Sequence, residues 1–326
     1  MPTDPSREFQ SVLSACLEKF LQEKHTCGYD YHEPTRILRH LDNFLVQEGL
    51  ATYELPSSIA RKWLAKKAHE SAQTHRQRIT VTRQFSRFLL RLGYPAYVPD
   101  STLAVRNPST FVPRMLTDEE LRKFFQAVDA LEPTARSPLR HLIMPEVFRL
   151  LFGCGFRVRE VLKLRVRDVD LQQGIITVRH GKFRKDRLVP PALSLVNRLR
   201  KYAAHFENRP PDAIFFPGPG GRPYSLRTIY GLFRQLLLQC GIPHAGRGKG
   251  PRIHDARHLF AVRALRRWYR DGEDLDAKLP LLATYLGHQH LSGTQYYLHL
   301  TAELFPEIAA RADAAFGDVI PRRSQP

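Results

Sequence analysis

The stretch from Gly93 to Arg114 constrains the fold most, because it divides the chain into two parts that we expect to fold separately. It has no sustained hydrophobic period, and among its short polar residues stand four prolines: Pro95, Pro99, Pro108 and Pro113. Proline has no backbone N–H and restricts the residue before it, so this composition favours an extended linker. The length of 326 residues also fits two domains. We predict an N-terminal domain over residues 1–94, a linker over 95–115 and a second domain over 116–326.

The charge of the chain indicates a polyanionic partner. Fifty Lys and Arg residues against 32 Asp and Glu residues give a net charge of +18. The positive charge is concentrated, since residues 1–60 carry −4, residues 61–92 carry +8 and residues 93–326 carry +14. A protein that is merely basic does not require such patches, and the most frequent partner of a basic patch is nucleic acid.

The N-terminal domain has the hydrophobic spacing of four helices. In the fourth, predicted over residues 72–92, Val81, Phe85 and Leu89 lie on one face. The opposite face carries a set that contains only arginine, namely Arg76, Arg83, Arg87 and Arg91. Solvated faces usually mix both signs, so we predict that this arginine face contacts DNA phosphates rather than solvent alone.

The second domain is predicted to be mostly helical with a small sheet. It begins with a capping box at Thr117 and Glu120. The β-prone runs 175–178 and 187–189 predict a hairpin with basic residues at its tip. Further helices are expected at about 192–205, 225–239, 255–269, 278–286 and 302–315. The chain as a whole is therefore mainly α, with a mixed α/β second domain.

Four separated segments combine residue types that bind or attack phosphates. They are Gly153-Cys154-Gly155-Phe156-Arg157-Val158-Arg159-Glu160, Gly181-Lys182-Phe183-Arg184-Lys185-Asp186-Arg187, His254-Asp255-Ala256-Arg257-His258, and Leu286-Gly287-His288 with Tyr297 nine residues later. In this order they resemble the signature segments of the tyrosine recombinase, or phage integrase, family. The resemblance implies a helical SAM-like core-binding domain followed by a mixed α/β catalytic domain.

Independently of the family resemblance, the residue types also fit phosphoryl-transfer chemistry. Breaking a phosphodiester needs a nucleophile, stabilisation of negative charge on the phosphate and a proton for the leaving oxygen. The planar fork of arginine matches phosphate oxygens, and His254 and Arg257 share one helix face. The resemblance assigns Arg157 and Arg257 to the scissile phosphate, Lys182 to the leaving 5′ oxygen, His254 to proton movement, His288 to a phosphate hydrogen bond and Tyr297 to the attack.

Two of these assignments have neighbouring competitors. Tyr296 is the alternative nucleophile, but one helical step turns a side chain by 100°, and the family interval from His288 selects Tyr297. Arg184 and Lys185 compete with Lys182 within the hairpin tip, where we otherwise expect them to contact DNA. We expect Glu160 to be the acidic partner of a nearby cation.

The predicted function is a site-specific DNA recombinase that joins strands through a 3′-phosphotyrosine for a mobile element. The resemblance implies double-stranded DNA with inverted-repeat half-sites held in a C-shaped clamp, and a homotetramer that can include a related recombinase. Two alternatives are a type IB topoisomerase-like enzyme and a catalytically silent DNA-binding protein. We expect no cofactor and no metal, because the sequence shows no ATP site and no carboxylate or cysteine accompanies His288, His290 and His299 at ligand spacing. The scattered cysteines and the absence of an apolar run of ~18 residues favour the cytoplasm and no membrane contact.

Overall fold

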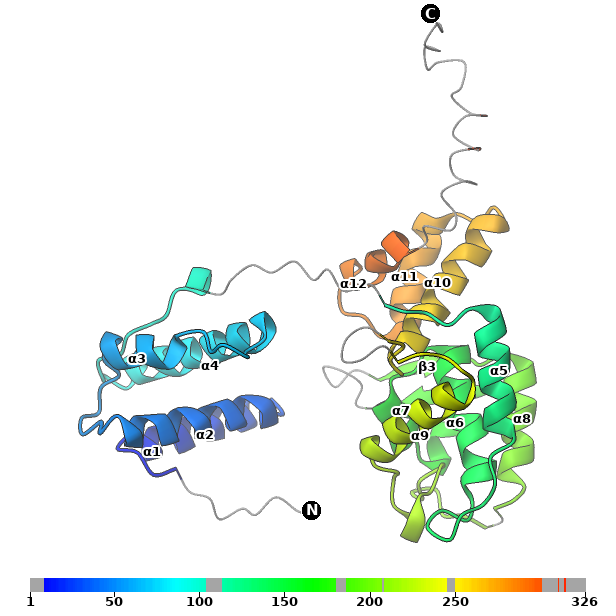
Figure 1. Cartoon of the computed structure of the whole chain (residues 1–326), viewed down its shortest axis with the longest axis horizontal. Coiled ribbons are helices and arrows are strands. Elements are labelled where there is room, and N and C mark those ends of the chain that lie inside the picture. The colour runs from blue at the N-terminus through cyan, green and yellow to red at the C-terminus, as the bar shows by residue number, and fades with distance from the viewer. Residues whose placement is uncertain are drawn as a thin grey trace, which may run out of the picture. The chain divides into compact units, whose positions relative to one another are not determined.

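The chain divides into two compact units, residues 1–110 and 111–326 (Figure 1). The computed structural model describes residues 9–103, 113–179, 186–206, 208–244 and 250–300, together with residues 310 and 314. Helices dominate both units, and the strands form one small antiparallel sheet, so the mainly α fold class is confirmed.

The first unit consists of four helices around an aromatic core. They are α1 (Ser14–Thr26), α2 (His32–Gln47), α3 (Ser57–Leu64) and α4 (Ala72–Arg91). The ring of Phe20 meets the rings of Phe85 and Phe88 edge to face, with centroids 5.7 and 5.3 Å apart. The apolar stripes of α1 and α4 therefore pack against each other, which leaves the opposite face of α4 at the surface.

The second unit is built around α6, a helix that is apolar on most of its faces. It contains α5 (Asp118–Asp129), α6 (Arg140–Cys154), α7 (Val158–Lys163), α8 (Leu193–Ala203), α9 (Leu226–Gln239), α10 (Asp255–Arg270), α11 (Leu275–Leu286) and α12 (Ser292–Gln295). α6 packs against α5, α7, α8 and α10, and these contacts bury residues on most of its faces. The chain continues from α12 into a short 3₁₀ helix, Tyr296–Leu300.

The sheet has the order β1-β2-β3, with β1 at Val169–Asp170, β2 at Ile175–Val178 and β3 at Arg187–Val189. β2 and β3 are antiparallel, and Thr177 lies opposite Leu188, so the predicted hairpin is confirmed. Its tip, residues 180–185, lies outside the described residues. β1 was not predicted, because a strand of two residues is too short to show a period of two.

The capping box at the start of the second unit is present as predicted. The Thr117 hydroxyl accepts from the Glu120 N–H at 3.2 Å, and the Glu120 carboxylate accepts from the Thr117 N–H at 2.9 Å. α11 begins at Leu275, earlier than the predicted residue 278, and the helix predicted over 302–315 lies outside the described ranges apart from residues 310 and 314. Within those ranges, no helix combines the length and hydrophobicity that a membrane span requires.

Candidate active site

The predicted phosphate-binding residues of the second unit meet where the ends of three helices come together. Arg257 lies in the first turn of α10 and is only 1% exposed. Its guanidinium donates to the carbonyl oxygen of Gly155 at 2.8 Å, just after α6, and to that of Leu286 at the end of α11. One buried cation therefore links the end of α6, the start of α10 and the end of α11, although Gly155 and Arg257 are 102 residues apart in sequence.

Gly155 allows this convergence. It ends α6 in the left-handed conformation with φ +64°, which only glycine adopts at little cost. A Cβ at this position would lie 2.7 Å from Cδ1 of Phe260 on α10, so no larger residue fits without a shift. Glycine therefore lets α10 approach closely enough for Arg257 to reach the Gly155 carbonyl.

Arg157 follows two residues later, as the residue that precedes α7. The Glu160 carboxylate accepts from the Arg157 N–H at 2.8 Å and from its Nη1 at 2.7 Å. A second arginine, Arg187 of β3, donates to both oxygens of the same carboxylate at 2.9 and 2.8 Å. Burial disfavours the charge on Glu160, but the hydrogen bonds and charges of Arg187 and Arg157 outweigh burial and lower its pKa to about 2. The expectation that Glu160 partners a cation agrees with these contacts.

The predicted nucleophile is buried and its neighbour is not. Tyr297 is 3% exposed, whereas Tyr296 is 38% exposed. The ring of Tyr297 lies between those of His258 and His288, with centroid distances of 5.4 and 5.9 Å. Burial raises the pKa of Tyr297, while the charge of Arg257 and a hydrogen bond from it oppose the rise. Tyr297 therefore carries its proton at neutral pH and lies against the buried arginine.

Arg257 remains a cation in this environment. Burial and the charge of Arg157 lower its pKa to about 10, and the neighbouring Tyr297 and Glu160 work in the opposite direction. The group is still charged near pH 7. Its position beside Arg157 places two positive charges near the Tyr297 hydroxyl, which is the arrangement that a phosphate needs.

His288 contacts Tyr297 directly, and His254 adjoins His258, which is the second histidine against the tyrosine. His288 follows α11, and its Nδ1 is 2.7 Å from Oγ1 of the buried Thr294, which fixes the orientation of the ring. His254 precedes α10 and packs edge to face on His258, with centroids 5.1 Å apart. His254 is exposed at one side, but the neighbouring residues remove part of its hydration, and this loss together with the charges of His258 and Arg257 lowers its pKa to about 4. His254 is therefore neutral at pH 7 and can accept a proton.

The sequence matches the phage integrase family over residues 114–303. The chain belongs to this family. A putative integrase/recombinase of Sinorhizobium fredii (strain NBRC 101917 / NGR234), y4rE, is 31% identical over 312 residues, which cover 93% of this chain and 97% of the relative. A second one from the same strain, y4rB, is 29% identical over 316 residues, covering 94% and 99%. Together with the family match, they identify a tyrosine-type site-specific DNA recombinase.

A solved structure shows the same fold. It is the XerH site-specific recombinase bound to palindromic difH substrate in a post-cleavage complex, with a TM-score of 0.61 at 19% identity. The likeness covers 85% of this chain and 78% of that chain.

The structure of this integrase-family chain brings together five of the six residues predicted for catalysis. Four of them, Arg157, Arg257, His254 and His288, lie at or next to the helix ends described above, and Tyr297 lies in the 3₁₀ helix that follows α12. The sixth, Lys182, lies outside the described residues, as do Arg184 and Lys185. The competition among these three basic residues therefore stays open.

The arginine face of α4 belongs to the other unit. Arg76, Arg87 and Arg91 are exposed and Arg83 is half-buried, so the face is at the surface. Arg91 pairs with Glu23 of α1 at 2.5 Å. A further arginine of this helix, Arg78, is buried and binds Glu70 at 2.6 Å, and it therefore belongs to the interior.

Two residues at the site had no predicted role. His258 contacts both His254 and Tyr297, and its Nδ1 is buried with no hydrogen-bond partner among the described residues. Arg187 closes the ion pair with Glu160. His258 lies in the same segment as Arg257, one residue on, and that position was the available signal. Nothing in the sequence pairs Arg187 with Glu160, because 27 residues separate them.

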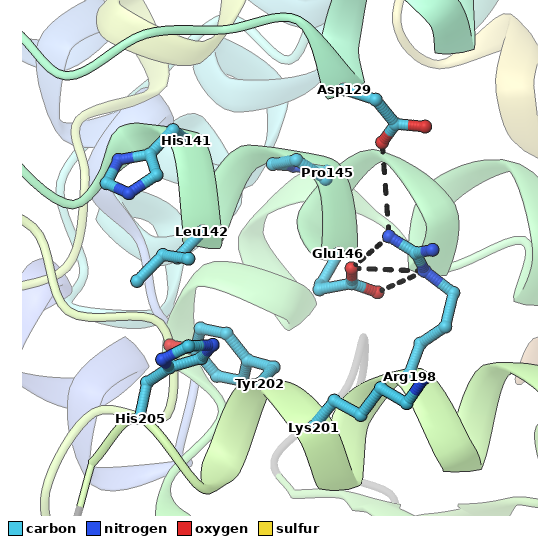
Figure 2. Close-up of a pocket in the computed structure, with 9 residues that line it drawn as sticks. All are labelled: Asp129, His141, Leu142, Pro145, Glu146, Arg198, Lys201, Tyr202 and His205. Atoms are coloured by element: carbon cyan, nitrogen blue, oxygen red, sulfur yellow. Dashed lines mark hydrogen bonds and ion pairs between the residues drawn. The ribbon is translucent and has the colours of Figure 1, made fainter.

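A second arginine–glutamate pair lies in the same unit, away from this site. It borders a pocket of about 330 Å³ between α6 and α8. Figure 2 shows Arg198 of α8 reaching across to Glu146 of α6, with Nη2 2.7 Å from Oε1. Glu146 is 5% exposed and lies nine residues before Gly155 along α6, which is ~13 Å of helix. This pair resembles Arg187 and Glu160 in chemistry without touching the predicted catalytic residues.

Proposed function

We propose that this recombinase cuts a DNA strand by attack of Tyr297 on the scissile phosphate and rejoins it by the reverse reaction. The Tyr297 oxygen bonds to phosphorus as the bond from phosphorus to the 5′ oxygen breaks. The phenolic proton leaves and the 5′ oxygen gains a proton, so the strand ends as a 3′-phosphotyrosine and a free 5′ hydroxyl. Because one phosphate ester replaces another, rejoining needs no external energy source.

The observation that carries this proposal is the packing of Tyr297 against a buried arginine and two histidines. Arg257 lies against the phenol, and Arg157 is near enough for its charge to act on the phenol as well. Two guanidinium groups at this point stabilise the charge that develops on the phosphate oxygens. Neutral His254 takes up the phenolic proton, His288 donates a hydrogen bond to the phosphate, and Lys182 delivers the proton to the 5′ oxygen.

The arginine face of α4 and the hairpin residues Arg184 and Lys185 supply further contacts to the DNA backbone. The substrate is double-stranded DNA with inverted-repeat half-sites, on which four copies of the chain assemble, alone or with a related recombinase. We place this activity in the cytoplasm and assign it to a mobile element. The support for the mobile element is the description of both relatives as putative integrases.

A suicide substrate tests the nucleophile. The DNA junction that flanks the gene's element provides the site, and a nick near it lets the cut strand diffuse away and traps the adduct. Wild type and Tyr296→Phe are expected to form protein–DNA adducts that survive denaturation, and Tyr297→Phe is expected to form none. Adducts that disappear with Tyr296→Phe instead would overturn the assignment. The absence of adducts with every variant, despite measured binding, would leave a silent DNA-binding protein.

A further inference from the structure

All three guanidinium nitrogens of Arg187 donate hydrogen bonds to two groups that border the proposed site. Its side chain is 8% exposed and lies at the start of β3. Nε donates to the carbonyl oxygen of Tyr285 in the last turn of α11 at 2.9 Å, and the two terminal nitrogens donate to Glu160. Arg187 therefore joins the hairpin, α7 and the end of α11 at one buried point.

The end of α11 is shaped to receive this side chain. Gly287 closes the helix with φ +68°, and a Cβ added there would lie 3.0 Å from Cδ of Arg187. His288 follows directly. The glycine thus provides both the left-handed turn and the room for the arginine, and a larger residue would push Arg187 away from Glu160.

Glu160 transmits the position of Arg187 to Arg157. The carboxylate is buried and shared by two guanidinium groups, which repel each other and stay close only because it lies between them. Without Arg187, the carboxylate loses its bidentate partner and keeps contacts only with Arg157 itself, through the Arg157 N–H and Nη1, so nothing ties the Glu160–Arg157 pair to β3 and the end of α11. The Arg157 guanidinium then loses its fixed direction.

We propose that Arg187 is a positioning residue, which aims Arg157 at the scissile phosphate by holding Glu160 against the end of α11. This inference rests on the proposed role of Arg157. Lysine cannot replace it fully, because a single ammonium lacks the fork that binds both carboxylate oxygens and the Tyr285 carbonyl together. A displacement of about 1 Å in such a group can cost about 100-fold in rate.

The test compares two substrates that differ only in charge at the scissile position. One carries the natural phosphate, and the other carries a methylphosphonate, in which an uncharged methyl group replaces one oxygen. Arg187→Gln is expected to slow adduct formation about 100-fold on the phosphate. On the neutral linkage the correctly placed Arg157 contributes less, so the ratio of wild-type to variant rate is expected to shrink at least about tenfold. A defect equal on both substrates indicates a general structural role and overturns the proposal, as does no defect on either.

Matched variants complete the design. Arg198→Gln removes an arginine from another buried glutamate of the same unit (Figure 2) and is expected to leave both rates unchanged. If Arg187→Gln does not fold, Arg187→Lys is compared with wild type on the same two substrates. Thermal unfolding checks that this variant folds. We expect it to form adducts more slowly than wild type on the phosphate. If wild type forms adducts that require Tyr297, the proposed function holds, and a negative result with the Arg187 variants then counts against this inference alone.

Discussion

At the scale of single residues, the surroundings of each group decide which groups of the site carry protons. Tyr297 keeps its proton because burial raises its pKa, and His254 stays neutral because its surroundings lower its pKa to about 4. A protonated acid and a neutral base therefore face a pair of guanidinium groups before DNA arrives. This is the starting state that general base catalysis requires.

The lowered pKa of His254 predicts a pH dependence of stability. An unfolded histidine has a pKa near 6.5, so between about pH 6.5 and pH 4 the unfolded chain binds a proton that folded His254 does not. The free energy of unfolding should therefore fall as the pH falls through this window. The stabilisation that His254 contributes is fully present above pH 6.5. His258, whose pKa is also lowered, acts in the same direction.

Thermal unfolding at pH 7.5 and 5.5 measures this effect. Wild type is expected to lose more of its midpoint temperature between the two pH values than His254→Gln, which has no titrating ring at this position. Equal losses in both proteins would show that His254 titrates normally in the folded state.

Motif spacing predicts candidate catalytic residues that the structure brings together, but not how they are held. Arg257 and Tyr297 follow from short segments with fixed intervals. The carbonyl oxygens that bind Arg257 belong to Gly155 and Leu286, and because every residue carries a backbone carbonyl, the sequence does not show which ones Arg257 binds. Positioning residues such as Arg187 are found only when the tertiary structure is known.

At the scale of elements, α4 separates its charges by face. The stripe that holds Phe85 is buried against α1 and α2, while Arg87 is exposed on the opposite side. The hydrophobic period predicted this helix within one residue of its end, because its amphipathic pattern is long and regular. The predicted α11 was too short, because the acidic residues at its start resemble a loop. In the structure, Asp274 caps the helix by accepting from the Asp276 and Ala277 N–H groups.

The exposed face of α4 predicts a change in the salt dependence of DNA binding. If Arg87 neutralises one phosphate, Arg87→Ala should reduce the slope of log K against log salt concentration by about 0.9. Arg267→Ala changes the net charge equally at the far end of α10, where Arg267 pairs with Asp271 at 3.4 Å, and should leave the slope unchanged. Titration of labelled duplex at several salt concentrations measures both. An unchanged slope in Arg87→Ala, or an equal reduction in both variants, would remove α4 from the DNA interface.

At the scale of the whole molecule, the two units divide the charge unevenly, because most of the +18 lies after residue 92. The five described residues that are predicted for catalysis all belong to the second unit. The prolines between residues 93 and 114 indicate where the chain divides, and the structure places the division after residue 110.

The number of nucleophiles in one chain predicts how many copies exchange two duplexes. One Tyr297 can hold one 3′ end, and exchange between two duplexes cuts four strands, so we predict that four chains act together. A plasmid with two copies of the site should therefore give deletion or inversion products whose yield rises steeply with protein concentration, and Tyr297→Phe should give none. Adduct formation on a single suicide half-site needs fewer chains and should saturate at lower concentration. Rapid relaxation of a one-site plasmid by wild type, without two-site products at any concentration, would indicate a chain that cuts and reseals alone.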